Sequence, residues 1–284
     1  MKSKPAYDVG GQAVIEGVMM KSPTKYSTAV RLENGKIRIQ TENFNSVVKK
    51  HPKLNIPIIR GIFYLFEMLI IGMKTLSWSA NQQSEGEEIS NTEIGITIAV
   101  SILLSLGIFV VAPFFVTKLF TSDNGMRFNL IDGGLRLVFF LVYVGIVGLF
   151  SDIRRVFQYH GAEHKAVNCN EKGMKLTVEN VAKCSTLHPR CGTSFLVWVI
   201  MISIVLFSFI TSPQWYIKLL SRIILIHLIA GISFELLKIS AKLKDHPAIR
   251  IAVYPGLWVQ KLTTREPDEK QIEVAIAAMK SAMR

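Results

Sequence analysis

Long apolar stretches without a charged side chain constrain this chain of 284 residues more than any other feature of its sequence. Residues 94–117 and 193–212 number 24 and 20, and they contain no Asp, Glu, Lys or Arg. A helix of about 20 apolar residues is long enough to cross a hydrocarbon core about 30 Å thick. Residues 130–150 and 216–240 have similar apolar centres. We therefore predict a mostly α-helical, polytopic membrane protein with about four transmembrane helices, arranged as hairpins over 94–150 and 193–240.

Positive charge is concentrated in three segments outside these spans. Residues 1–53 hold ten Lys and Arg, residues 151–192 hold seven, and residues 241–284 hold eight. Because such residues are retained on the cytoplasmic side, we expect both termini and the 151–192 loop to be cytoplasmic in a multi-pass protein of the cytoplasmic (inner) membrane. The net charge of +12 then reflects insertion and contact with membrane lipid, and no nucleic acid partner is expected. Membrane-protein partners and a homo-oligomer are both left open.

The segment 54–80 does not fit this topology as a fifth span, because it would move the cationic residues 1–53 to the outside. Arg60, Glu67 and Lys74 recur every seven residues and share one face of a helix whose other face is apolar. We predict an interfacial or re-entrant amphipathic helix. A true span with Arg60 and Glu67 facing the bundle interior is the alternative.

Residues 1–53 are predicted to form a cytoplasmic β-rich region. The segment 10–20 is β-branched with flanking glycines and predicts one strand, in which Glu16 lies either on a solvent face or towards the 151–192 loop or Arg60. Asn34-Gly35 lies between two alternating runs in residues 28–41, which is a strong hairpin pattern. A small antiparallel sheet follows from these patterns.

The tail 241–284 is predicted to be cytoplasmic and to end in a helix. Pro267 followed by acidic residues is typical of a helix start. Four apolar residues then form one stripe suited to packing: Ile272, Ile276, Met279 and Met283. Pro255-Gly256 predicts a break in the segment before it.

The sequence His160-Gly161-Ala162-Glu163-His164 is the candidate for a divalent-metal site. If this segment is helical, His160 and His164 share one face and can both reach one Zn²⁺, while Glu163 can take a proton from water activated by the metal. The order H-x-x-E-H is that of the inverted zincins. A solvated helix with ordinary contacts four residues apart is the alternative.

Further ligand types follow in the same loop, since all three cysteines and three of the six histidines lie within 32 residues. His188 and Cys191 are candidate metal ligands beside His160 and His164, and this donor set favours Zn²⁺ as the divalent metal. Cys184 and Cys169 are expected to be small, buried apolar residues without a ligand role. Glu235, near the end of the last span, is a candidate third ligand or a partner of Lys238.

Two other polar groups fall within the spans. Asp132 and Arg136 are four residues apart on a helix, so we expect them to neutralise each other. His227 is either a functional group or a residue satisfied by one hydrogen bond to a neighbouring helix.

Four blocks of sequence resemble the YqhQ-like family of bacterial membrane proteins, which is a domain of unknown function. These blocks are residues 10–20, 160–169, 188–195 and 262–267, and the resemblance runs from about residue 6 to residue 280. Members of that family are described as predicted metal-dependent enzymes, so the resemblance implies a metal-dependent activity.

Three functions are consistent with these residues. The first is a metal-dependent hydrolase with Glu163 as catalytic base, acting on peptides by analogy with inverted zincins or on a lipid headgroup. The second is a membrane scaffold or regulator in which the metal is structural. The third is a transport or insertion-assisting protein, in which a polar path is lined by four residues: His227, Glu235, Arg60 and Glu67.

Overall fold

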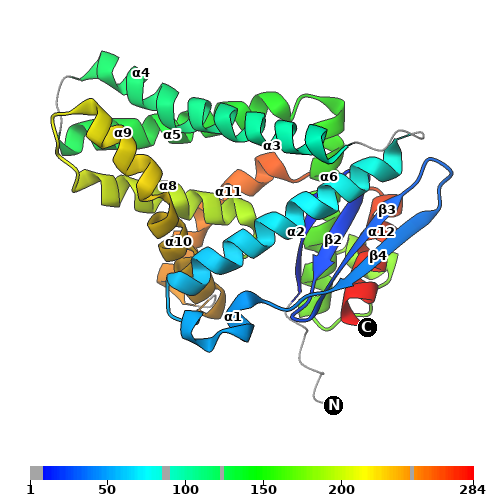
Figure 1. Cartoon of the computed structure of the whole chain (residues 1–284). Coiled ribbons are helices and arrows are strands. Elements are labelled where there is room, and N and C mark those ends of the chain that lie inside the picture. The colour runs from blue at the N-terminus through cyan, green and yellow to red at the C-terminus, as the bar shows by residue number, and fades with distance from the viewer. Residues whose placement is uncertain (1–8, 85–89, 122–124, 244–245) are drawn as a thin grey trace.

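Four antiparallel strands form one sheet in the order β1-β2-β3-β4 near the beginning of the chain (Figure 1). They are β1 (Gly10–Val14), β2 (Gly17–Lys21), β3 (Lys25–Arg31) and β4 (Ile37–Asn43). The computed structural model describes residues 9–84, 90–121, 125–243 and 246–284. The rest of the described chain is mostly helical, so the predicted combination of a small antiparallel sheet and many helices is confirmed.

The hairpin predicted around Asn34-Gly35 is confirmed. Strands β3 and β4 pair from Arg31 opposite Ile37 to Lys25 opposite Asn43. Gly35 has a φ of 80°, which a residue without a Cβ adopts at little cost, and the Asn34 side chain accepts a hydrogen bond from the Lys36 amide.

The prediction of a single strand over residues 10–20 is wrong, because the chain reverses at Ile15 and Glu16 and forms the hairpin β1–β2. Glu16 takes a positive φ of 52° without being glycine. Distant contacts hold this turn: the Ile15 amide donates to Ser79, and the Glu16 carboxylate binds Arg155 and Tyr159. The turn depends on tertiary partners that the local sequence does not reveal.

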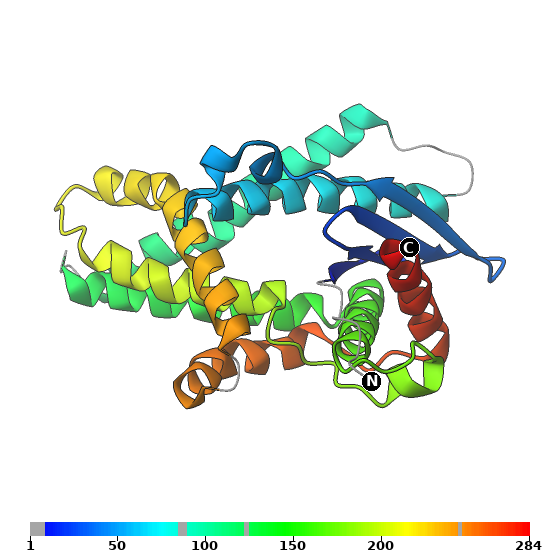
Figure 2. The ribbon, with the colours of Figure 1, turned by 90° about the horizontal axis from the view of Figure 1, so that it is seen from below.

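Helices cover both faces of the sheet (Figure 2). Alternate side chains of a strand point to opposite faces, so Val18 and Met20 join the core made with α6 (Ser151–Glu171) and α12 (Glu269–Met283). Met19 points the other way, towards α2 (Ile59–Gln83). The sheet is therefore one layer of a unit that is completed by α2, which follows it in the chain, and by two helices far along the chain, α6 and α12.

The C-terminal helix α12 begins after Asp268, two residues later than the sequence indicates. Asp268 and Gln271 form a capping box that satisfies the first amides. The predicted stripe is confirmed, since Ile272, Ile276 and Met279 are buried against α6 and the sheet and Met283 is partly buried there.

The first predicted hairpin of apolar helices is present. One arm consists of α3 (Asn91–Leu106), the π-helix η2 (Gly107–Val111) and α4 (Ala112–Phe120), and its residues 92–120 form one candidate span. The wider η2 turn lies just before Pro113, which has no amide to donate. The other arm is α5 (Met126–Val147), and both arms are long and apolar enough to cross a membrane.

The second predicted hairpin consists of shorter pieces. Helix α8 (Gly192–Ser208) has 17 residues, and the last predicted span is bent by 45° between α9 (Trp215–Ile224) and α10 (Ile226–Lys242). By length and composition the described residues contain two candidate spans, or three if the bent pair is one span. This supports a membrane protein, and the count of four spans stays a prediction.

The break predicted at Pro255-Gly256 is wrong, because α11 (Pro247–Thr263) continues through both residues. Helix α11 packs along α8, and a Cβ at Gly256 would lie 2.7 Å from the Ser194 hydroxyl. This close packing offsets the hydrogen bond that Pro255 cannot make.

The helix predicted over 54–80 is α2, which begins at Ile59 and continues to Gln83. Two short elements precede it, α1 (Val47–Lys50) and η1 (Pro52–Leu54). Helix α2 is not among the candidate spans of the described residues. It contacts β1 and β3 as well as α10, and its interfacial placement stays a prediction.

Candidate metal centre

Helix α6 places His160 and His164 on one face, as their spacing requires. The helix runs without interruption from Ser151 to Glu171, with Asp152 in its first turn, where a carboxylate complements the helix dipole. The two imidazole rings lie with their centroids 4.4 Å apart. Half of the segment 151–192, which the sequence analysis treats as a loop, is thus this helix, and the short helix α7 (Val178–Ala182) follows it.

Each of these two histidines directs one ring nitrogen to a backbone carbonyl. His160 Nδ1 lies 2.9 Å from the Thr263 oxygen, and His164 Nδ1 lies 2.5 Å from the Thr186 oxygen. A carbonyl only accepts, so each Nδ1 donates, and Nε2 is then the nitrogen that offers a lone pair in the neutral ring. This arrangement is typical of metal-ligating histidines, whose second nitrogen is fixed in the same way.

Cys191 completes a group of three donor atoms. Its Sγ lies 3.2 Å from His160 Nε2, and the three donor atoms of His160, His164 and Cys191 all lie within 4.8 Å of one another. A tetrahedral Zn²⁺ with ordinary bond lengths holds N and S ligands about 3.6 Å apart. The donor types and the spacing therefore fit Zn²⁺.

The fold also explains why Cys191 points inward. It is the N-cap of α8, and its Sγ accepts from the Thr193 amide at 3.5 Å. Its side chain and that of His164 are buried, whereas His160 is half-buried, and the three donors lie between α6, α8 and the end of α11.

Glu163 borders this group from the side of the sheet. The residue is buried, and its Oε2 lies 3.5 Å from His164 Nε2. A Cβ at Gly11 would come within 3.0 Å of the Glu163 Cγ, so the glycine in β1 leaves room for this carboxylate. Glu163 therefore lies beside His164 and is not one of the three grouped donors.

His188, which the sequence indicates as a ligand, is not part of the three-donor group in the described chain. Its Nε2 lies 3.1 Å from Glu171, and its Nδ1 accepts from the Arg190 amide at 3.4 Å. The Arg190 guanidinium also pairs with Glu171. The hydrogen bond from His188 and these charges lower the pKa of Glu171 to about 2, despite its partial burial.

Gln260 on α11 holds the backbone of this loop. Its amide accepts from the His188 amide at 2.9 Å and donates to the His188 carbonyl and the Ser194 hydroxyl, each at 2.8 Å. The side chain is fully buried. Sequence reasoning did not identify Gln260, Thr186 or Thr263, because a carbonyl acceptor has no side-chain signature and a single glutamine matches no motif.

The other sequence candidates lie elsewhere. Glu235 forms a bidentate salt bridge with Arg60, with N–O distances of 2.6 and 2.5 Å, and this salt bridge joins α10 to α2. Glu67 accepts from Ser46 and the Val47 amide at the start of α1. His227 stacks on Phe66 with ring centroids 6.2 Å apart. The structure does not bring these side chains into one cluster.

Cys169 and Cys184 are buried in the core between α6 and α12, as expected. All three cysteines are free thiols. Burial raises the pKa of Cys169 to about 11, so this thiol stays protonated and behaves as an apolar core group.

Comparison with known proteins agrees with the resemblance noted in the sequence. A family profile described as "Protein of unknown function (DUF1385)" matches residues 56–284. The chain is also 36% identical over 306 residues to the uncharacterized protein YqhQ of Bacillus subtilis strain 168, covering 100% of this chain and 94% of that protein. No solved structure matches the chain. The profile and the full-length relative together show that the chain belongs to the DUF1385 family.

Proposed function

We propose that this chain is a multi-pass protein of the cytoplasmic membrane that binds Zn²⁺ through His160, His164 and Cys191 and acts as a metal-dependent hydrolase. The observation that carries this proposal is the orientation of the two imidazoles. Both direct Nδ1 to a carbonyl, His160 Nε2 lies 3.2 Å from the Cys191 sulfur, and His164 offers a donor atom within 4.8 Å of the other two.

The number of ligands favours a catalytic site over a closed structural one. Structural zinc sites have four protein ligands, whereas catalytic sites use three and leave one position open. Bound Zn²⁺ supplies Lewis acidity and lowers the pKa of water. Glu163, 3.5 Å from His164 Nε2, is the group that would accept the proton. The substrate is a peptide or a lipid headgroup, both accessible at a membrane surface.

The membrane placement rests on the apolar helices and on charge. The beginning of the described chain, in β1, and its end, in α12, belong to one unit at the same end of the molecule (Figure 1). We assign this unit to the cytoplasm because its segments carry the excess of Lys and Arg. The bundle then has four spans, with α8 as a short third span and the bent α9–α10 pair as the fourth, in contact with lipid and available to protein partners or a second copy.

A structural metal is the second candidate, favoured by where the ligands lie in the chain. Two ligands belong to α6, which packs on the sheet, and the third begins α8, which packs in the apolar bundle. A metal there would fasten the cytoplasmic unit to the membrane helices. The transport hypothesis has less support, because Glu67, the Arg60–Glu235 pair and His227 each have separate partners.

Metal analysis of the full chain purified in detergent tests the site. We expect about one zinc per wild-type chain, loss of zinc in His160→Ala and Cys191→Ala, and retention in Glu163→Gln and in the exposed-histidine control His246→Ala. A folded wild-type protein that binds no zinc, even when zinc is supplied, contradicts both metal hypotheses.

A complementation assay separates the two metal hypotheses. If the protein is a hydrolase, Glu163→Gln keeps its zinc but does not restore the phenotype of a strain that lacks the gene. If the metal is structural, Glu163→Gln keeps the zinc and restores the phenotype.

A further inference from the structure

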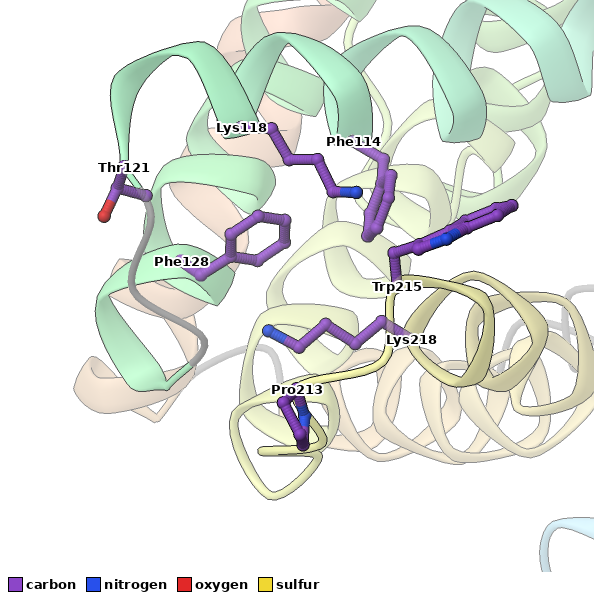
Figure 3. A pocket seen from close by; sticks show the side chains of 7 residues that line it. All are labelled: Phe114, Lys118, Thr121, Phe128, Pro213, Trp215 and Lys218. Carbon is purple, nitrogen blue, oxygen red and sulfur yellow. The ribbon is translucent and has the colours of Figure 1, made fainter.

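A pocket of about 250 Å³ between the ends of α4, α5 and α9 lies away from the metal centre (Figure 3). It is at the end of the helical bundle farthest from the sheet (Figure 1). Next to it, Arg222 donates to the buried Asp132 at 2.9 and 3.1 Å, and Arg136 lies 3.1 Å from the same carboxylate. This confirms the predicted Asp132–Arg136 pair and adds a partner from α9. A substrate of the metal centre therefore binds elsewhere, nearer the sheet.

Strand β1 is an edge of the sheet and runs beside the metal centre. Its one partner strand is β2, and it lies on the side of the sheet that faces the bundle (Figure 2). A Cβ at Gly11 would come within 3.0 Å of the Glu163 Cγ, and Glu163 Oε2 lies 3.5 Å from His164 Nε2. Paired strands are about 4.8 Å apart, so a chain paired with the free edge of β1 would pass close to these donors.

The free edge of β1 presents two residues with unpaired backbone groups. Val14 and Gly17 flank a two-residue turn and form its first bonded pair, and in an antiparallel ladder only alternate residues bond to the partner strand. The amides and carbonyls of Gly11 and Ala13 therefore point away from β2. Within the described ranges none of these four groups has a hydrogen-bond partner.

An extended peptide has the complementary groups. Along one edge of a strand, pairs of N–H and C=O repeat every second residue, about 7 Å apart, which matches the spacing from Gly11 to Ala13. Both residues are half-buried, so solvent reaches this edge, and their side chains are the two smallest. A lipid headgroup has no such repeat of donors and acceptors. The edge thus favours a peptide over a headgroup.

We propose that an extended peptide pairs with the free edge of β1 and that this peptide is the substrate of the metal centre. The inference rests on the proposed hydrolase for the role of the peptide only, because strand pairing itself needs no metal. Pairing at Gly11 and Ala13 brings a peptide bond beside Glu163. Hydrolysis adds the hydroxyl of water to the carbonyl carbon, the C–N bond breaks, and Glu163 carries the proton of that water to the leaving nitrogen.

The test measures peptide binding by fluorescence anisotropy. The probes are a fluorescein-labelled octapeptide of alternating Thr and Val and its fully N-methylated analogue, which has the same side chains but no backbone donor. The protein is the full-length Glu163→Gln chain in a neutral detergent, so that bound peptide is not cleaved. We expect the octapeptide to bind and the N-methylated analogue not to bind.

Two proline variants of this chain locate the site. Ala13→Pro removes an amide that has no partner within the fold, and proline at such a position is tolerated in an edge strand. The lost hydrogen bond should weaken binding about tenfold. Ile39→Pro is the matched control, because the Ile39 amide points away from β3 at the other edge of the sheet, and it should leave binding unchanged.

The outcomes separate this inference from the proposed function. Equal binding of both peptides, or unchanged affinity in a folded Ala13→Pro, overturns strand pairing at β1. Absence of octapeptide binding does so as well, and it leaves a lipid headgroup as the substrate. If Ala13→Pro does not fold, the comparison of the two peptides decides. Zinc is measured on the same samples: peptide binding by a protein that takes up no zinc supports this site and contradicts the hydrolase, whereas zinc uptake without peptide binding does the reverse.

Discussion

Replacement of Gln260 by methionine should weaken both the fold and the metal centre. The side chain is fully buried and makes three hydrogen bonds, to the two backbone polar groups of His188 and to Ser194, at 2.8–2.9 Å. At about 1 kcal/mol for each bond, Gln260→Met should lower the free energy of unfolding by about 3 kcal/mol. Methionine has a similar length, so the loss measures hydrogen bonding more than volume.

The metal centre should weaken as well, because the three Gln260 hydrogen bonds hold the loop that ends in Cys191. A looser loop should reduce zinc affinity about 10- to 100-fold, the range found for residues that support metal ligands. Melting can be followed with a thiol-reactive dye, since all three cysteines are buried, and zinc affinity by competition with a chelator. Gln214→Met, at an exposed position, is the control. Wild-type melting together with wild-type zinc affinity in Gln260→Met would refute this reasoning.

Three further predictions concern other contacts. Arg222→Met removes one of the two partners of buried Asp132 and should lower the free energy of unfolding by about 3–5 kcal/mol, measured as loss of monodisperse protein. Adding Asp132→Asn to the same chain should restore part of the yield, and equal yields in all variants would contradict the pairing. The pKa of Glu171 is lowered from 4.5 to about 2 in the fold, so its stabilisation is complete above pH about 4.5 and disappears towards pH about 2; Glu171→Gln should flatten this part of a stability profile against pH, and an unchanged profile would be inconsistent with the ion pair. Gly161→Ala places a Cβ against the Arg265 carbonyl and should destabilise the protein by about 1–3 kcal/mol in thermal melts, whereas a neutral effect would show that the chain there can move aside.

Features governed by neighbours in the chain could be predicted. The apolar blocks form helices, and whether a helix is long and apolar enough to cross a membrane depends on composition and length alone. The Asn34-Gly35 turn forms because its backbone preferences are local. The same holds for the i,i+4 placement of His160 and His164 on α6. The β1–β2 hairpin was not predicted because contacts distant in the sequence hold its turn. Partners on α6 bind Glu16 in its positive-φ conformation, and Ser79 on α2 accepts from the Ile15 amide.

By itself, then, the amino-acid sequence determined the helical class, the apolar character of the bundle, one hairpin and the pair of histidines. Only the tertiary structure decided that Cys191 joins that pair while His188 turns to Glu171, and that Glu235 binds Arg60. The physical reason is that spacing along one helix orients side chains on that helix alone. The choice between ligands on separate segments depends on long-range packing, here on the end of α11, where Gln260 and Thr263 orient the cysteine loop and His160.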